Sequence, residues 1–142
     1  MATTYLITSH QPVVSFVVPT LNRGKYVLRA VRSCLKNNDE NVCIEVVVID
    51  SSSNDGSFEE LQQEFSDDNR VKLLQNPRGS GPIKSWLEGV ESISGDYFTF
   101  VWSDDLISPL FLKTLLKPLL DARADVAIGF GKNELLDREL DF

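Results

Sequence analysis

The sequence has few of the residues that build disulfide, metal and nucleic-acid sites. Its 142 residues include one His and two Cys. Cys34 and Cys43 form no C-x-x-C pair, and His10 has no partner at metal-ligand spacing, which excludes a disulfide scaffold and argues against structural zinc. Both cysteines are expected to be small buried apolar residues of a reduced, cytoplasmic chain. With 14 Lys+Arg against 21 Asp+Glu, the net charge of −7 argues against a nucleic-acid partner.

Long hydrophobic runs are also missing. The first residues contain no basic stretch followed by an apolar one, so they do not resemble a signal peptide. The most apolar run, Leu106 to Leu120, is interrupted by charged residues and Pro118 and is too short to span a bilayer. The length and the ordinary content of hydrophobic residues, 42%, predict a single domain over residues 1–142.

Apolar runs alternate with amphipathic segments along the chain. The predicted strands are Val13–Val18, Ile44–Ile49, Val71–Leu74, Tyr97–Trp102 and Val126–Phe130. The predicted helices are Lys25–Lys36, Phe58–Phe65, Ile83–Ser92 and a last one that runs from Pro109, as its first helical residue, to about Leu116. We expect Pro19 to stop the first strand and the Tyr and Trp of the fourth to be core residues. This alternation predicts an α/β fold with a mainly parallel sheet and helices on both faces.

Polar segments follow three of the predicted strands, at the carboxyl ends where parallel α/β sheets bind ligands. Two adjacent carboxylates, Asp104 and Asp105, repel each other, and a divalent cation (Mg²⁺ or Mn²⁺) would offset that repulsion. The alternative is that they cap the next helix or lie in a solvated turn. The sequence therefore carries a candidate metal site here, with a structural alternative.

Two other segments are candidates for ligand contacts. Asp50 could accept hydrogen bonds from a ribose hydroxyl or a base N–H, or it could be a turn residue, with Asp55 the stronger helix-capping candidate. Residues Pro19 to Arg23 could present backbone N–H groups and a helix N-terminus to an anion, or form an ordinary strand-to-helix turn. Gly79 and Gly81 complete neither a dinucleotide fingerprint nor a P-loop, and no Ser/His/Asp arrangement is present.

Four motifs, taken in order, resemble the family 2 glycosyltransferases, which have the GT-A fold. They are Val14–Arg23 (VSFVVPTLNR), Val46–Gly56 (VVVIDSSSNDG), the stretch from Gly89 to Asp105 that ends in FVWSDD, and Pro109 with the helix after it. The resemblance covers roughly residues 13 to 120. It implies the nucleotide-binding half of a GT-A domain and a nucleotide-sugar donor, often a UDP-sugar.

The resemblance also implies roles for individual residues. Thr20 and Asp50 match positions that hold the base and ribose, and Asp104 matches the metal-coordinating carboxylate beside its acidic neighbour Asp105. The full set implied for nucleotide binding is Pro19, Thr20, Asn22, Arg23, Asp50, Ser51, Lys84 and Asp104. The implied reaction is transfer with inversion to the hydroxyl of a carbohydrate or lipid-linked acceptor, deprotonated by a general base.

The chain departs from the family pattern at several positions. Leu21 stands where Tyr is frequent, Ser51 and Ser52 replace Asp and Gly, Trp102 replaces the first acidic residue of the metal-binding segment, and Trp86 stands where a basic residue is frequent, with Lys84 nearby. These departures favour an alternative function, a non-catalytic GT-A-like module that binds a nucleotide or a protein. A nucleotidyltransferase is a third hypothesis, which no phosphate-binding glycine loop supports.

The acceptor-binding half of the family, which carries the general base, follows the matched region. No residue of this chain is identifiable as that base, and solvated surface is the expected place for the later acidic residues: Asp121, Asp125, Glu134, Asp137, Glu139 and Asp141. A half-domain would expose apolar surface, which predicts a homo-oligomer or a completing partner chain. The expected location is cytoplasmic, including the inner face of a membrane.

Overall fold

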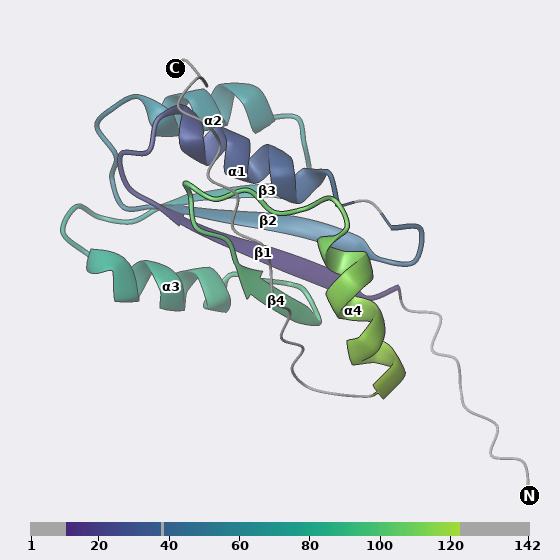
Figure 1. Cartoon of the computed structure of the whole chain (residues 1–142). Helices are drawn as coiled ribbons and strands as arrows, with labels where there is room; N and C mark the ends of the chain where they lie inside the picture. Colours follow the sequence, from purple (N-terminus) through teal and green to yellow (C-terminus); the bar gives the residue numbers. More distant parts are fainter. Residues whose placement is uncertain (1–10, 38, 123–142) are drawn as a thin grey trace, which may run out of the picture.

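The computed structural model describes residues 11–37 and 39–122 (Figure 1). The strands are β1 (Val13–Thr20), β2 (Cys43–Asp50), β3 (Val71–Gln75) and β4 (Tyr97–Phe100); the helices are α1 (Lys25–Leu35), α2 (Ser57–Phe65), α3 (Gly81–Glu91) and α4 (Phe111–Ala122). Each predicted element within these residues is present, whereas His10 and the predicted strand Val126–Phe130 lie outside them. Within the described ranges no helix has the length and apolar character needed to cross a membrane.

The four strands form one parallel sheet in the order β3-β2-β1-β4. The central strand β1 pairs with β2 from Val13↔Cys43 to Thr20↔Asp50, and with β4 over a shorter range that ends at Val17↔Phe100. Because all strands run the same way, their carboxyl ends meet at one edge of the sheet. The predicted α/β fold with a parallel sheet is confirmed.

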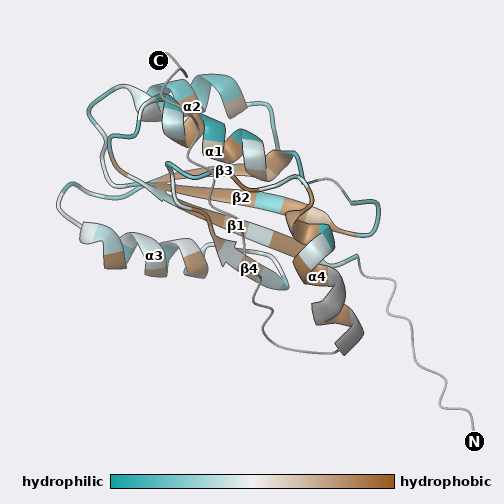
Figure 2. Cartoon of the chain, viewed as in Figure 1, coloured by the Kyte–Doolittle hydropathy of each residue, from teal (hydrophilic) through white to brown (hydrophobic). Residues whose placement is uncertain are grey.

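Helices cover both faces of the sheet, as expected (Figure 1). Successive residues of β1 point to opposite faces: Phe16 and Val18 join the core beneath α1, α2 and α4, whereas Val17 packs on the other side with Val47 and Ile49. Helix α3 approaches that second side so closely that a Cβ on Gly89 would lie 2.5 Å from Val17 Cγ1. The hydrophobic residues therefore line the sheet on both sides (Figure 2).

Pro19 does not end β1, contrary to the sequence-based expectation. The Thr20 carbonyl oxygen accepts a hydrogen bond from Ser51 N on the β2 side, and Val17 O accepts one from Val101 N on the β4 side. The backbone N–H and C=O groups of every second residue in a strand point to the same neighbouring strand. The backbone of Pro19 therefore faces β4, as that of Val17 does, but beyond the last paired residue of β4. Its missing N–H therefore costs no ladder hydrogen bond.

Three further expectations were wrong. The last helix begins at Phe111 rather than at Pro109, and it continues past Pro118 to Ala122. Cys43 is exposed because it lies at the start of β2, outside the helix-covered part of the sheet, whereas Cys34 is buried as expected. Trp102 is 46% exposed because β4 is the edge strand of the sheet that the described residues form, and α3 covers it only partly; Tyr97, on the opposite face, does pack against the core.

Candidate functional site

The carboxyl edge of the sheet brings three polar side chains to the same level. Thr20 at the end of β1 is in register with Asp50 of β2, which is in register with Gln75 of β3. Asp50 is fully buried, and its carboxylate accepts hydrogen bonds from Ser53 N at 2.8 Å, from Ser53 Oγ, and from Gln75 Nε2 at 3.0 Å. Asp50 thus holds the following turn in place while it lies beside Thr20.

The loops after β1 and β2 are tied together by side-chain to backbone hydrogen bonds. Asn22 N donates to Ser53 Oγ at 2.8 Å, and Asn54 N donates to Asn22 Oδ1 at 2.8 Å. Gly24 N donates to Asp55 Oδ2 at 2.9 Å. Asn22 and Gly24 both have positive φ, 51° and 45°, a conformation that Asn and Gly adopt most readily. The loop that begins α1 is therefore fixed relative to the loop that begins α2.

Asp55 contributes to this arrangement from the start of α2, although the N-cap position itself is Gly56. The Asp55 carboxylate accepts hydrogen bonds from Ser57 N at 3.1 Å and Ser57 Oγ at 2.5 Å. Desolvation alone would raise the pKa of this carboxyl, but the hydrogen bonds from Ser57 and Gly24 outweigh it and the pKa lies below its ordinary value. Asp55 is thus held ionised between the two loops.

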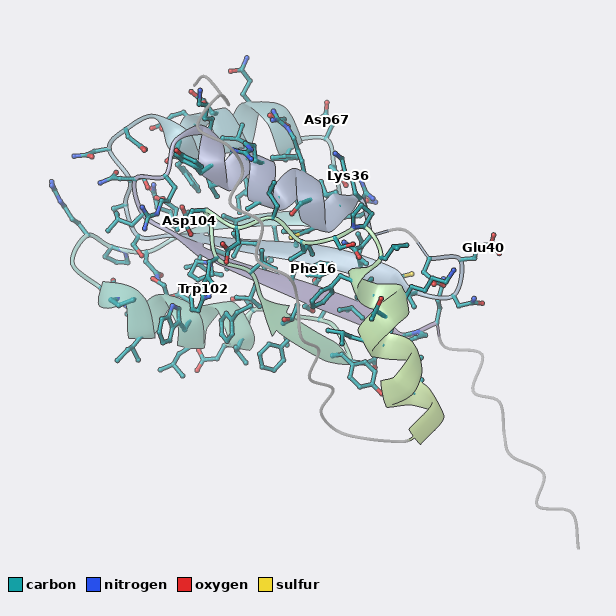
Figure 3. All side chains as sticks on the ribbon, in the orientation of Figure 1. Phe16, Lys36, Glu40, Asp67, Trp102 and Asp104 are labelled. Carbon is teal, nitrogen blue, oxygen red and sulfur yellow. The ribbon has the colours of Figure 1, made fainter. Side chains whose placement is uncertain are left out.

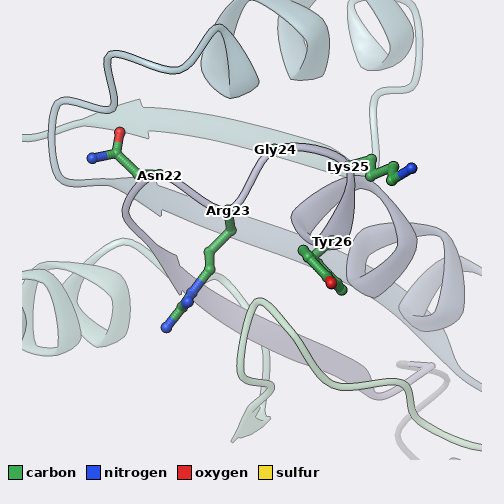
Figure 4. Close-up of a pocket in the computed structure, with 5 residues that line it drawn as sticks. All are labelled: Asn22, Arg23, Gly24, Lys25 and Tyr26. Atoms are coloured by element: carbon green, nitrogen blue, oxygen red, sulfur yellow. The ribbon is translucent and has the colours of Figure 1, made fainter. Parts of the chain in front are cut away.

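A hollow of about 300 Å³ lies where β1 passes into α1, and residues Asn22 to Tyr26 line it (Figure 4). Arg23 and Lys25 line the hollow and the first turn of α1 contains no acidic residue, while the Asp55 carboxylate lies against Gly24 N and that of Asp104 beside Arg23. The start of a helix also presents backbone N–H groups and the positive end of the helix dipole. These features suit the hollow to an anion such as a phosphate group.

Asp104 and Asp105 lie in the turn that follows β4, and both are exposed. Asp105 N donates to Trp102 O at 3.0 Å, which closes the turn. Asp104 Oδ2 lies 3.7 Å from a guanidinium nitrogen of Arg23, so the Asp104 carboxylate reaches the edge of the hollow. Figure 3 labels Asp104 at this edge and Trp102 on the side of α3.

No group of three or more acidic, His or Cys side chains that could hold a metal is present in the described part of the chain. Asp104 and its neighbour are therefore not a closed metal site. They do fit a hard cation such as Mg²⁺, which proteins usually hold through one or two carboxylates together with substrate phosphates.

Sequence reasoning missed a second group of polar residues at the same edge, on the α3 side. Asn76 follows β3, is buried, and donates from Nδ2 to Ser85 Oγ at 3.1 Å, while Ser51 Oγ lies 2.7 Å from the same hydroxyl. Ser52 Oγ donates to Asn76 O at 2.5 Å, which holds Ser52 at a φ of 61°. The rule that placed Asp50 at the edge could have placed Asn76 there too, because both directly end or follow a parallel strand.

Two buried polar atoms at this edge have no hydrogen-bond partner: Thr20 Oγ1 and Asn76 Oδ1. Most buried polar atoms are paired, so an unpaired one indicates a place for a water or ligand group. Lys84, by contrast, lies exposed on the first turn of α3, and Ser51 bonds to α3 rather than to the hollow. The structure therefore brings Thr20, Asn22, Arg23, Asp50 and Asp104 to the α1 side of the edge and leaves Lys84 on the other.

Comparison with known proteins gives a consistent result. The model of "Glycosyl transferase family 2" matches residues 15–137. Glycosyltransferase GlyG of Streptococcus pneumoniae is 34% identical over 116 residues, 82% of this chain and 38% of that protein. The GalNAc(5)-diNAcBac-PP-undecaprenol beta-1,3-glucosyltransferase of Campylobacter jejuni is 31% identical over 129 residues, 90% of this chain and 40% of that protein.

Solved structures agree. Crystal structures of S. aureus TarS residues 1–349, alone and with UDP-GlcNAc, superpose with TM-scores of 0.66 and 0.65 at 28% identity. They cover 77% of this chain and about a third of TarS 1–349. The chain therefore spans about two fifths or less of the proteins that it matches here. By its fold and by the matched family, the chain belongs to glycosyl transferase family 2.

Proposed function

We propose that this chain binds the nucleotide-sugar donor of an inverting, metal-assisted glycosyltransferase, and that the donor is a UDP-sugar. The observation that carries the proposal is the meeting of opposite charges at one edge, where Asp104 lies 3.7 Å from Arg23 beside the hollow at the start of α1. A nucleoside diphosphate with a divalent cation carries both complementary charges. Such a ligand would use the hollow and the carboxylates at the same time.

The residues at the ends of β1 and β2 would take the nucleoside. Thr20 Oγ1 has no partner and can donate to or accept from a base or ribose group. Asp50 offers an acceptor when the Ser53 hydroxyl rotates away from it. Pro19, Asn22 and Ser51 complete the proposed contacts, and Leu21, 51% exposed, gives the base an aliphatic surface in place of an aromatic ring.

The cation would be held by Asp104 with Asp105, and Mn²⁺ or Mg²⁺ suits these oxygen ligands. When bound, it supplies Lewis-acid stabilisation of the departing nucleoside diphosphate. With the cation bound to Asp104, Arg23 is then free to pair with a phosphate oxygen, as guanidinium groups do well. Lys84, on the first turn of α3, can add a further positive charge at the same edge.

In the proposed reaction an acceptor hydroxyl attacks the anomeric carbon, and the bond from that carbon to the diphosphate oxygen breaks. The new bond forms on the opposite face of the sugar, which inverts the configuration. A general base takes the hydroxyl proton, and we place this base, with the carbohydrate or lipid-linked acceptor, outside the described residues. The chain is thus the donor-binding part of the activity, and a cytoplasmic location would give it access to nucleotide-sugars.

Calorimetric titration with UDP, with and without Mn²⁺, tests this proposal. We expect binding that requires Mn²⁺ and that weakens at least about tenfold in Asp104→Ala. Asp67→Ala is the matched control, because Asp67 is also exposed but lies after α2, away from the site. Equal affinity in Asp104→Ala and the parent chain, or equal affinity with EDTA, would contradict the proposal.

A non-catalytic nucleotide-binding module is the second candidate, favoured by Trp102 in place of an acidic residue. Both candidates predict UDP binding, so binding alone does not separate them. Release of UDP from UDP-sugars by the purified chain does, because turnover of any nucleotide-sugar contradicts the non-catalytic alternative.

A further inference from the structure

Asp104 and Asp105 lie in the middle of an irregular segment of the chain. Strand β4 ends at Phe100 and helix α4 begins at Phe111, so neither a helix nor a strand fixes the residues between them. The hydrogen bond from Asp105 N to Trp102 O closes the turn but does not connect it to any other element. Groups that form a binding site must keep their positions to within about 0.5 Å, so this segment needs anchors on other elements.

The first anchor lies three residues before Asp104. Val101 N donates to Val17 O of β1 at 2.9 Å, which extends the pairing of β1 with β4 by one residue. Val101 and Ser103 are both buried, whereas Asp104 and Asp105 are exposed. The chain is therefore held in place as it enters the turn, and the two acidic residues lie on the outer side of that turn.

The second anchor lies three residues after Asp104, and helix α1 provides it. Ile107 N donates to Ser33 Oγ at 3.2 Å, a hydrogen bond between residues 74 positions apart in the sequence. The same hydroxyl donates to Ala30 O at 2.7 Å, so it acts as donor and acceptor together. Ile107 also packs against the core beneath α1, and the segment after β4 runs beside this helix (Figure 1).

Ser33 is a polar residue on a helix face that is otherwise apolar. It is 7% exposed, and the other buried residues of α1 are Val27, Leu28, Ala30, Val31 and Cys34. Alanine has a higher helix propensity and would keep this face apolar throughout. What the hydroxyl adds at this position is an acceptor for Ile107 N, since its own proton is already used by Ala30 O.

Asn37, four residues after Ser33, holds the far end of the same segment. Its side chain is buried, and Oδ1 accepts a hydrogen bond from Leu112 N at 3.2 Å. Leu112 belongs to the first turn of α4, where backbone N–H groups have no acceptor within the helix. Asn37 Nδ2 also donates to Ser33 O at 3.2 Å, which joins the two anchoring residues to each other.

Helix α1 therefore contacts the candidate site in two ways. The hollow proposed for phosphate groups lies at its start, and Ser33, further along the helix, anchors the segment that carries Asp104. The two parts of the site meet where Asp104 Oδ2 lies 3.7 Å from Arg23. Because the backbone hydrogen bonds of an α-helix keep it in one piece, α1 sets the separation between the phosphate and cation positions.

We propose that Ser33 is a positioning residue for the cation: its hydroxyl fixes Ile107, and thereby the turn that presents Asp104 and Asp105. The inference rests on the proposed function, because it assigns Ser33 a role in cation binding. Loss of the hydroxyl would leave Ile107 N without this acceptor and would give the turn more freedom to move. The cation would then have to order the carboxylates as it binds, which lowers its affinity.

Amide hydrogen exchange of Ser33→Ala, followed by NMR, tests whether the hydroxyl fixes the turn. We expect the Asp105 amide to exchange at least about threefold faster than in the parent chain. The Val71 amide is the reference, because it donates to Asp68 O in a similar local hydrogen bond at the start of β3. We expect its exchange to be unchanged, whereas a general loss of order would accelerate both amides.

Calorimetric titration with UDP and Mn²⁺ tests the consequence for the cation. We expect the Mn²⁺-dependent affinity of Ser33→Ala to be about three- to tenfold lower than that of the parent chain. Cys34→Ala is the matched control, because it also removes one buried side-chain atom from α1 but leaves the Ser33 hydroxyl in place. Ser33→Thr keeps a hydroxyl that can reach the same carbonyl, and we expect it to retain the parent affinity.

The two measurements separate this inference from the proposed function. An Asp105 amide that exchanges at the parent rate in Ser33→Ala overturns the role of Ser33, whether or not the chain binds UDP. Faster exchange with unchanged Mn²⁺-dependent affinity also overturns it, because the turn would then not determine cation binding. If the parent chain binds no UDP, the proposed function fails, and the exchange of Asp105 alone supports or overturns the anchoring of the turn by Ser33. Circular dichroism establishes that all variants fold.

Discussion

Replacement of Gly95 by Ala is expected to destabilise the chain strongly, because Gly95 lies just before β4, packed against the start of the neighbouring strand β1. A Cβ at this position would lie 2.9 Å from the carbonyl oxygens of Val13 and Tyr97, and it would overlap Ser15 Oγ. Gly95 N also donates to Ser15 Oγ at 3.1 Å and to Glu45 Oε1 at 3.2 Å. The backbone therefore cannot move away without loss of these hydrogen bonds.

The expected magnitude follows from three opposing contributions. Overpacking against fixed backbone costs ~2–3 kcal/mol, and weakening of two hydrogen bonds, one of them to a carboxylate, costs ~1–2 kcal/mol. The smaller entropy of the unfolded Ala chain returns ~0.5–1 kcal/mol. The net loss is ~2–4 kcal/mol, a large share of the ~5–15 kcal/mol that stabilises a typical domain.

Urea unfolding of Gly95→Ala, Ser15→Ala and the double variant measures this loss and its origin. Removal of the Ser15 hydroxyl relieves one of the three close approaches, so we expect the double variant to be more stable than the sum of the single losses by ~1 kcal/mol. A loss below ~0.5 kcal/mol for Gly95→Ala would refute the reasoning, since it would mean that β4 can shift freely against β1.

Other predictions concern stability and its dependence on pH. Desolvation would raise the pKa of the Glu45 carboxyl, but hydrogen bonds from Ser15, Ser94 and Gly95 lower it below its ordinary value of 4.5. The ionised Glu45 therefore stabilises the fold fully above pH 4.5, and this stabilisation is lost as the pH falls through the pKa of the folded state. Glu45→Gln should therefore lower the free energy of unfolding by ~1–2 kcal/mol at pH 7 in urea unfolding, and the free energy of unfolding of the variant should fall less steeply below about pH 4.5. The same steepness in the variant and the parent chain at low pH would count against this. Gly89→Ala should cost ~1–2 kcal/mol in thermal unfolding, because the gain in helix propensity does not offset the contact with Val17, and a rise in Tm would disprove it.

Much of the fold follows from sequence periodicity and turn chemistry. The β-branched run of β2 predicts a strand covered on both faces, and Val46 to Ile49 are indeed fully buried. The alternation of strands and helices predicts a parallel sheet, and Asp50 at the end of β2 and Asp104 in the turn after β4 do lie at its carboxyl edge. These features depend on local patterns, which a single sequence contains.

The failures depend on features that no local pattern contains. Pro19 continues β1 because its missing N–H faces the place where β4 has already ended, which requires the strand order and register. Trp102 is exposed because α3 leaves β4, the last strand of the described sheet, partly uncovered. The hydrogen bonds of Asn76 with Ser85 and Ser52 join three separate segments, so they appear only once the sheet is assembled.

The hydrogen bonds between the first two loops have a consequence for ligand affinity. Residues 22–24 and 53–55 are joined at three points, so the surface that they form is preorganised. A flexible loop pays roughly 1–2 kcal/mol in backbone entropy for each residue that a ligand orders. These residues are already ordered in the folded chain, so a ligand does not have to order them. More of the favourable free energy of each contact therefore contributes to binding.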